Sequence, residues 1–224
     1  MKNRRPAALC ALLLAFGFGL LALEASSPQS PPPTTAAEMA RLLQAHYNTV
    51  RDFTAEFTHQ YHGGVLRQSL SESGHVKIKK PGRMYWTYTT PEKKEFVSDG
   101  AKIYTYVPDD KLVVIADMPK GNEASTALLF LTGQGDLVRD FRPALPKNQP
   151  NGLWQLDLVP KTTQADFTSL SLVIDPRTLA LRGLSSTDAQ DGQSTFIFRS
   201  LRENTGLADN QFAFKIPRGV EVRR

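Results

Sequence analysis

The chain has 224 residues, of which 41% are hydrophobic and 22% are charged, and its formal net charge is +5. These values are typical of a globular protein and exclude a wholly disordered chain or a protein with several membrane spans. One cysteine and four histidines exclude an internal disulfide framework and leave little material for a metal centre. We therefore expect neither a metal nor a cofactor.

The N-terminal segment has the layout of a secretory signal peptide. A short basic stretch precedes an almost unbroken apolar run over residues 7–23, and small residues follow. We predict a signal peptide over residues 1–25, cleaved after Ala25, with an uncleaved membrane anchor as the alternative because the run reaches the lower length limit for a span. Residues 26–35 are rich in proline and predict an extended linker. Residues 36–224 then form a single domain.

A helix is predicted directly after this linker. Thr35 and Glu38 have the spacing of a capping box, in which each side chain accepts a hydrogen bond from the backbone of the other residue. Apolar residues then recur along one helical stripe, which includes Leu42 and Tyr47. We predict a helix over residues 36–50 whose apolar stripe packs against the rest of the domain.

After residue 51 the apolar period changes from 3.6 to two, which is typical of strands. Alternating segments lie at residues 53–58, 76–79, 83–88, 101–107, 111–117, 153–159, 167–174, 178–186, 194–203 and 211–216. Turn residues separate many of them, which favours an antiparallel sheet in meander order. We predict a mainly β fold with an α lid: an incomplete, half-open antiparallel β-barrel of about eleven strands, covered by the N-terminal helix and short inserted helices.

Two segments without alternation, residues 125–132 and 136–141, predict the inserted helices. A curved sheet of this size encloses more space than ordinary side chains fill. We therefore expect either an apolar chamber beneath the helices, suited to a hydrocarbon ligand, or the plain packed core of a β-sandwich, with which the same alternation is compatible.

Four segments carry a family resemblance. They are VRDFTAEFTHQY (50–61), GHVKIKKPGRMYWTY (74–88), VSDGAKIYTYVPDDKLVVI (97–115) and FAFKIPRGVEV (212–222). In their order and spacing these segments resemble the LolA family of periplasmic outer-membrane lipoprotein carriers, over about residues 36–224.

The resemblance implies a function, partners and a location. It implies a periplasmic chaperone that binds the acyl chains of lipoproteins in a hydrophobic cavity and carries them from the inner to the outer membrane. The implied partners are outer-membrane lipoproteins, a LolCDE-type inner-membrane transporter and a LolB-type receptor, with no nucleic acid, and the carrier is expected to be a monomer. We find no nucleophile–base constellation in the sequence and expect no enzyme activity. The alternative is an envelope sensor or regulatory domain of the same fold that binds a protein partner or lipid.

The resemblance also implies which residues form the site. We expect the acyl cavity to be lined by Tyr47, Phe53, Phe57, Met84, Trp86, Tyr88, Leu128 and Leu129, with no catalytic or metal-binding residue. In the family, the residue before the proline of the second segment is typically an arginine that hydrogen-bonds the lid backbone, and here it is Lys80. We expect Lys80 to be the lid latch, although lysine lacks the planar fork of arginine.

The residues themselves show a basic cluster around the same turn. Lys80 and the neighbouring Lys77, Lys79 and Arg83 predict either a solvated strand face or a docking patch for an acidic partner or phospholipid head groups.

Overall fold

The computed structural model describes residues 33–63, 68–118, 131, 133, 135–163 and 167–224. These residues belong to one unit, Pro33–Arg224. The predicted signal peptide, most of the predicted linker, and Leu128 and Leu129 lie outside the described residues. In the part of the chain that is described, no helix combines the length and the apolar character needed to cross a membrane.

Helix α1 runs from Ala36 to Thr49, and its start confirms the predicted capping box. The Thr35 hydroxyl accepts a hydrogen bond from the Glu38 amide at 3.2 Å, and the Glu38 carboxylate accepts one from the Thr35 amide at 3.1 Å. Leu43 is buried, whereas Leu42 is 37% exposed, so its predicted place on the packed stripe is wrong. Neighbouring helical residues are rotated by about 100°, and packing selects Leu43 over Leu42.

The rest of the described chain is mostly strand. The strands are β1 (Asp52–Gly63), β2 (Gln68–Lys79), β3 (Arg83–Thr90), β4 (Lys94–Asp99), β5 (Lys102–Val107), β6 (Leu112–Asp117), β7 (Phe141–Ala144), β8 (Trp154–Pro160), β9 (Ser169–Ile174), β10 (Leu181–Thr187), β11 (Gln193–Glu203) and β12 (Glu221–Arg223). They form one sheet in the order β12-β6-β5-β4-β3-β2-β1-β11-β10-β9-β8-β7.

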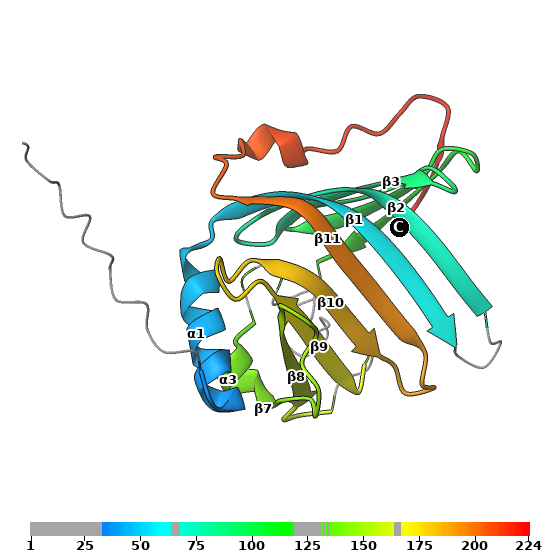
Figure 1. Cartoon of the computed structure of the whole chain (residues 1–224). Helices are drawn as coiled ribbons and strands as arrows, with labels where there is room; N and C mark the ends of the chain where they lie inside the picture. Colours follow the sequence, from blue (N-terminus) through cyan, green and yellow to red (C-terminus); the bar gives the residue numbers. More distant parts are fainter. Residues whose placement is uncertain (1–32, 64–67, 119–130, 132, 134, 164–166) are drawn as a thin grey trace, which may run out of the picture. The chain divides into compact units, whose positions relative to one another are not determined.

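This order contains two antiparallel meanders, β1 to β6 and β7 to β11, which the pairing of β1 with β11 joins (Figure 1). The sheet remains open, because its edge strands β7 and β12 do not pair with each other. The prediction of a half-open antiparallel barrel is confirmed, with twelve strands in the described chain instead of about eleven. One pairing departs from it, since β12 runs parallel to β6.

Several local elements differ from the sequence prediction. Strands β4, β7 and β12 fall where no strand is predicted, and the helix predicted over residues 136–141 is the single turn α3 (Leu137–Asp140). The strand predicted over residues 211–216 is wrong, because Asp209–Phe212 form the 3-10 helix η2 there. Phe212 is 1% exposed and η2 contacts β3 and β4. Burial of this ring, and not pairing of a strand, therefore fixes the local conformation.

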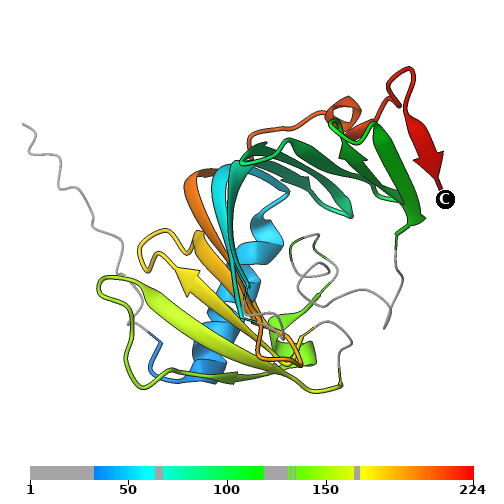
Figure 2. The same cartoon turned by 90° about the vertical axis from the view of Figure 1, so that its right-hand side faces the viewer.

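Helix α1 lies on the inner side of the curved sheet, as Figure 2 shows, and it contacts α3, β7 and β8. One face of the sheet shares a hydrophobic core with α1. We call it the inner face. Successive side chains of a strand point to opposite faces. Phe53 and Phe57 of β1 and Met84 and Trp86 of β3 consequently share the inner face and join α1 in one core.

Candidate functional site

Five aromatic rings from three strands meet on the inner face. Phe57 of β1 packs edge-on against Trp86 and Tyr88 of β3, with ring centroids 5.0 and 4.8 Å apart. Trp86 also contacts Phe196 of β11 at 5.2 Å, and Phe198 lies 6.4 Å from both Trp86 and Phe196. We call these five rings the aromatic floor. Edge-to-face contacts of this kind hold large apolar side chains in fixed positions.

The structure brings together six of the eight residues predicted to line the acyl cavity. All six belong to one hydrophobic cluster and are between 3% and 8% exposed. They are Tyr47, Phe53, Phe57, Met84, Trp86 and Tyr88. The other two, Leu128 and Leu129, lie outside the described residues. Sequence reasoning did not select Phe196 and Phe198, although both lie in a predicted strand, because nothing local shows that β11 pairs with β1.

A small apolar cavity lies between α1 and strands β9 to β11. It has a volume of about 30 Å³, and its lining includes Leu43, Tyr47, Phe53, Leu172 and Ile174. A cavity needs about 10–15 Å³ to hold one water molecule, so this one has room for about two, whereas an apolar cavity that accepts benzene measures about 150 Å³. An acyl chain can enter this cavity only if the surrounding side chains or α1 move.

Lys80 lies in the turn between β2 and β3, and its side chain reaches α1. Its ammonium donates a hydrogen bond to the Tyr47 carbonyl and lies 3.3 Å from the centre of the Tyr47 ring. Burial lowers the pKa of Lys80 to about 8, while the negative charge of Glu203 opposes this shift. A Cβ built on Gly133 would lie 2.5 Å from Lys80 Cδ, so the lysine stem packs against the backbone of Gly133.

The latch expected from the resemblance is a bond from this position to the lid backbone. The carbonyl that Lys80 reaches belongs to Tyr47 of α1, which is one part of the predicted lid. A bond to the helix predicted over residues 125–132 comes from the Tyr47 hydroxyl, which donates to the Leu131 carbonyl at 2.7 Å. Burial raises the pKa of Tyr47, so the phenol remains a donor at neutral pH. No sequence signal points to this bond, because it joins residues that are far apart in the chain.

At one end of the aromatic floor, the side chains on the inner face are polar. His59 Nδ1 lies 3.2 Å from Glu72 Oε2, and His59 Nε2 lies 2.8 Å from the Ser194 hydroxyl. The Lys94 ammonium pairs with the other carboxylate oxygen of Glu72. Burial lowers the pKa of His59, and the contact with Glu72 partly offsets that shift. We call His59, Glu72 and Lys94 the His59 cluster.

This cluster does not form a metal centre. The described residues contain no group of three histidine, cysteine, aspartate or glutamate side chains that could hold a metal ion. His62, three residues after His59, hydrogen-bonds Ser69 at an exposed position. Residues three apart on a strand point to opposite faces, which separates the two histidines.

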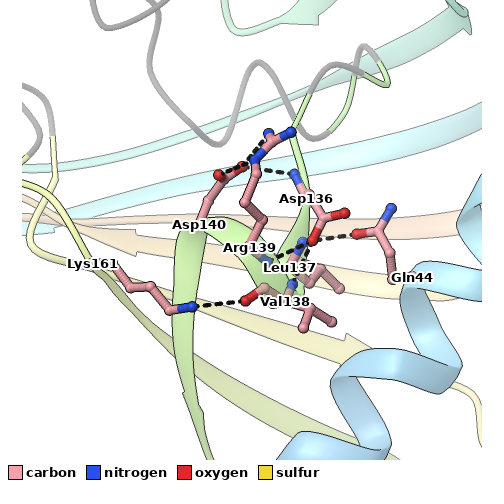
Figure 3. A network of polar contacts seen from close by, with 7 residues as sticks. All are labelled: Gln44, Asp136, Leu137, Val138, Arg139, Asp140 and Lys161. Carbon is pink, nitrogen blue, oxygen red and sulfur yellow. Dashed lines mark hydrogen bonds and ion pairs between the residues drawn. The ribbon is translucent and has the colours of Figure 1, made fainter.

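Besides the bonds that join Tyr47 to Lys80 and Leu131, two sets of polar contacts hold α1 in place. On one side the Gln44 side-chain oxygen accepts a hydrogen bond from the Leu137 amide of α3 at 2.8 Å (Figure 3). The Asp136 carboxylate caps α3 by accepting bonds of 2.8 and 2.6 Å from the Val138 and Arg139 amides. On the other side His46 lies 3.1 Å from Glu203 of β11. Movement of α1 therefore breaks contacts with α3, with β11 and with Lys80.

The basic cluster around β2 and β3 holds the C-terminal segment. Lys79 lies 2.5 Å from Asp209, which also lies 3.5 Å from Arg83, and Lys77 donates to the Gln211 side chain at 3.1 Å. These contacts differ from both predicted roles, a solvated face and a free docking patch. These pairings cannot be predicted from local sequence, because the partners of the basic side chains lie more than 120 residues further along the chain.

The fold and the inner face define a class of protein: an open antiparallel sheet whose aromatic inner face shares one core with an N-terminal helix. The crystal structure of an uncharacterized conserved protein from Thermus thermophilus is similar to this fold. The TM-score is 0.53 at 13% identity, and the match covers 83% of this chain and 99% of that chain.

Sequence comparison then identifies the family. The family model described as outer membrane lipoprotein carrier protein LolA matches residues 48–215. An outer-membrane lipoprotein carrier protein of Legionella pneumophila strain Corby is 32% identical over 185 residues, covering 82% of this chain and 88% of the relative. That of Chromohalobacter salexigens is 28% identical, covering 83% and 86%. The chain belongs to the LolA family, and the resemblance stated from sequence is confirmed.

Proposed function

We propose that the protein is a periplasmic chaperone that carries lipoproteins from the inner to the outer membrane with their acyl chains on the inner face of the sheet. The aromatic floor is the observation that carries this proposal, and family membership supports it. Each methylene moved out of water gains about 0.8 kcal/mol, so a long acyl chain needs a large apolar surface. Five clustered rings next to Met84 and the face of α1 offer such a surface.

Reversible binding follows from the way the inner face is covered. The cavity beside α1 measures about 30 Å³, so an acyl chain that enters it must displace side chains or α1. A protein whose binding-competent form is only fractionally populated has its apparent affinity lowered by that fraction. The packed form therefore competes with the cargo and favours its release without a chemical energy source. The unbranched thioether of Met84 suits an interior that must adapt to chains of different shapes.

The proposed role also names partners. The protein would receive lipoproteins from a LolCDE-type transporter and deliver them to a LolB-type receptor, acting as a monomer in the periplasm. The role requires no catalytic group. Lys80 is proposed to stabilise the covered form through Tyr47, which contacts both the Lys80 ammonium and the Leu131 carbonyl.

The test is to export the full chain in a Gram-negative host, purify it from the periplasm and analyse retained lipoprotein and lipid by mass spectrometry. Binding of a triacylated cysteinyl lipopeptide is then measured for the wild type and for Trp86→Ala. Phe214→Ala is the matched control, because Phe214 stacks on Tyr104 at 5.3 Å and is no part of the aromatic floor. We expect co-purified lipoprotein, and a loss of lipopeptide binding in Trp86→Ala that exceeds its loss of folded protein.

Two results would contradict the proposal. If Trp86→Ala loses binding only in proportion to folded protein, the aromatic floor is a plain core. If the exported protein retains no acylated molecule and instead forms one stable complex with a single protein, the sensor alternative replaces the carrier.

A further inference from the structure

The His59 cluster places buried charge at one end of the aromatic floor. The Glu72 side chain is 5% exposed, and the His59 and Lys94 side chains are 16% and 24% exposed. Both oxygens of the Glu72 carboxylate have partners, one the imidazole of His59 and the other the ammonium of Lys94. Burying charged groups costs free energy unless they are paired in this way.

The cluster is joined directly to the apolar floor. The His59 ring stacks on Phe196 with centroids 4.2 Å apart and an interplanar angle of 2°. The Lys94 ammonium lies 4.5 Å from the centre of the Tyr88 ring, which forms a T-shaped contact with Phe57. The inner face therefore changes from apolar to polar within the width of one aromatic ring, which matches the two parts of an amphiphile.

Donor groups remain available at this border. A lysine ammonium has three N–H donors, and within the described residues that of Lys94 has one hydrogen-bond acceptor, Glu72. Among the same residues the Tyr88 hydroxyl forms no hydrogen bond, and burial raises its pKa, so it keeps its proton. Each oxygen of the Glu72 carboxylate already has one partner, His59 or Lys94. Within the described residues, the groups at this border that keep N–H or O–H donors without an acceptor are Lys94 and Tyr88, which fits a ligand that presents acceptor oxygens.

We propose that Tyr88 and Lys94 donate hydrogen bonds to the acyl carbonyl oxygens of a bound lipid, whose hydrocarbon chain lies along the aromatic floor. His59 and Glu72 act as positioning residues that hold Lys94 and the adjoining ring of Phe196 in place. The inference rests on the proposed carrier function and assigns the polar end of the same site. From Phe53 to His59 a strand extends about 20 Å, and one leaflet of hydrocarbon is about 15 Å thick. The inner face is therefore long enough for an acyl chain with its carbonyl at the His59 cluster.

The test compares two probes of equal chain length, a diacylglyceryl-cysteine lipopeptide and its dialkyl ether analogue, which lacks the ester carbonyls. The variants are Tyr88→Phe and Lys94→Met, made in the full chain. Tyr85→Phe is the matched control, because Tyr85 lies on the same strand, points to the opposite face and donates to Glu95 at 2.6 Å. Tyr88→Phe removes no hydrogen bond to a described residue, so it remains informative even if Lys94→Met, which removes a partner of buried Glu72, fails to fold.

We expect Tyr88→Phe to weaken ester binding by about three- to tenfold, the range of one net hydrogen bond, and to leave ether binding unchanged. Equal effects on both probes, or no effect on either, would overturn the inference while leaving the carrier function intact. If the wild type binds neither probe, the carrier function fails and the inference fails with it. Palmitate is the third probe, and tighter binding of palmitate than of the ester would reassign the donors to a free carboxylate.

Discussion

Replacing Lys80 by methionine tests whether the contact between Lys80 and α1 controls access to the inner face. The substitution keeps the unbranched stem that packs against Gly133 and removes the ammonium that contacts Tyr47. The Tyr47 carbonyl loses one donor but still accepts a bond from the Val50 amide at 3.2 Å. No carbonyl is therefore left without a partner, and the effect of the variant reports on the charge of Lys80.

The magnitude follows from three opposing effects. A cation over an aromatic ring contributes about 0.5–2 kcal/mol, and a hydrogen bond from a charged donor contributes about 1.5–3 kcal/mol. Burial of the ammonium opposes both, as the lowered pKa of about 8 shows, although partial exposure screens that cost. We expect a net loss of about 1–2 kcal/mol in the free energy of unfolding. If α1 must leave Lys80 before an acyl chain enters, the same loss makes opening about 5- to 30-fold more favourable.

The assay is stopped-flow uptake of a triacylated lipopeptide, followed by tryptophan fluorescence, together with urea unfolding of the same samples. Lys102→Met is the control, because Lys102 is half exposed and pairs with Asp117 at 3.2 Å. We expect faster uptake and weaker retention in Lys80→Met, and wild-type behaviour in the control. The Lys80→Met variant could be less stable and still take up lipopeptide within about twofold of the wild-type rate. That result would refute a role of Lys80 in access to the inner face.

Two further outcomes are expected. Gly74→Ala should lower the free energy of unfolding by about 2 kcal/mol or more in urea titrations, because the new Cβ would lie 1.9 Å from the Thr87 carbonyl oxygen; a wild-type midpoint would contradict this. Asp52→Ala should accelerate amide exchange at Gly206, whose amide donates to the buried Asp52 carboxylate at 3.1 Å, and unchanged exchange would remove that anchor.

The sequence by itself determined the elements whose cause is local. The capping box of Thr35 and Glu38 placed the start of α1, because both hydrogen bonds form within one turn. Period-two alternation placed Phe53 and Phe57 on one face of β1, and Met84 and Trp86 on one face of β3, because strand geometry alone fixes which side chains share a face. The family resemblance identified the same faces.

The tertiary structure alone decided how these faces meet. The pairing of β1 with β11 brings Phe196 beside Trp86, although the two residues are 110 positions apart in the chain. Long-range contacts also decide the conformation of residues 209–212. Phe212 is buried against the sheet and Asp209 pairs with Lys79, so the local alternation there does not produce a strand. Which strand or segment a given face packs against depends on how the buried surfaces fit together in the folded chain. The sequence of one segment alone does not determine that fit.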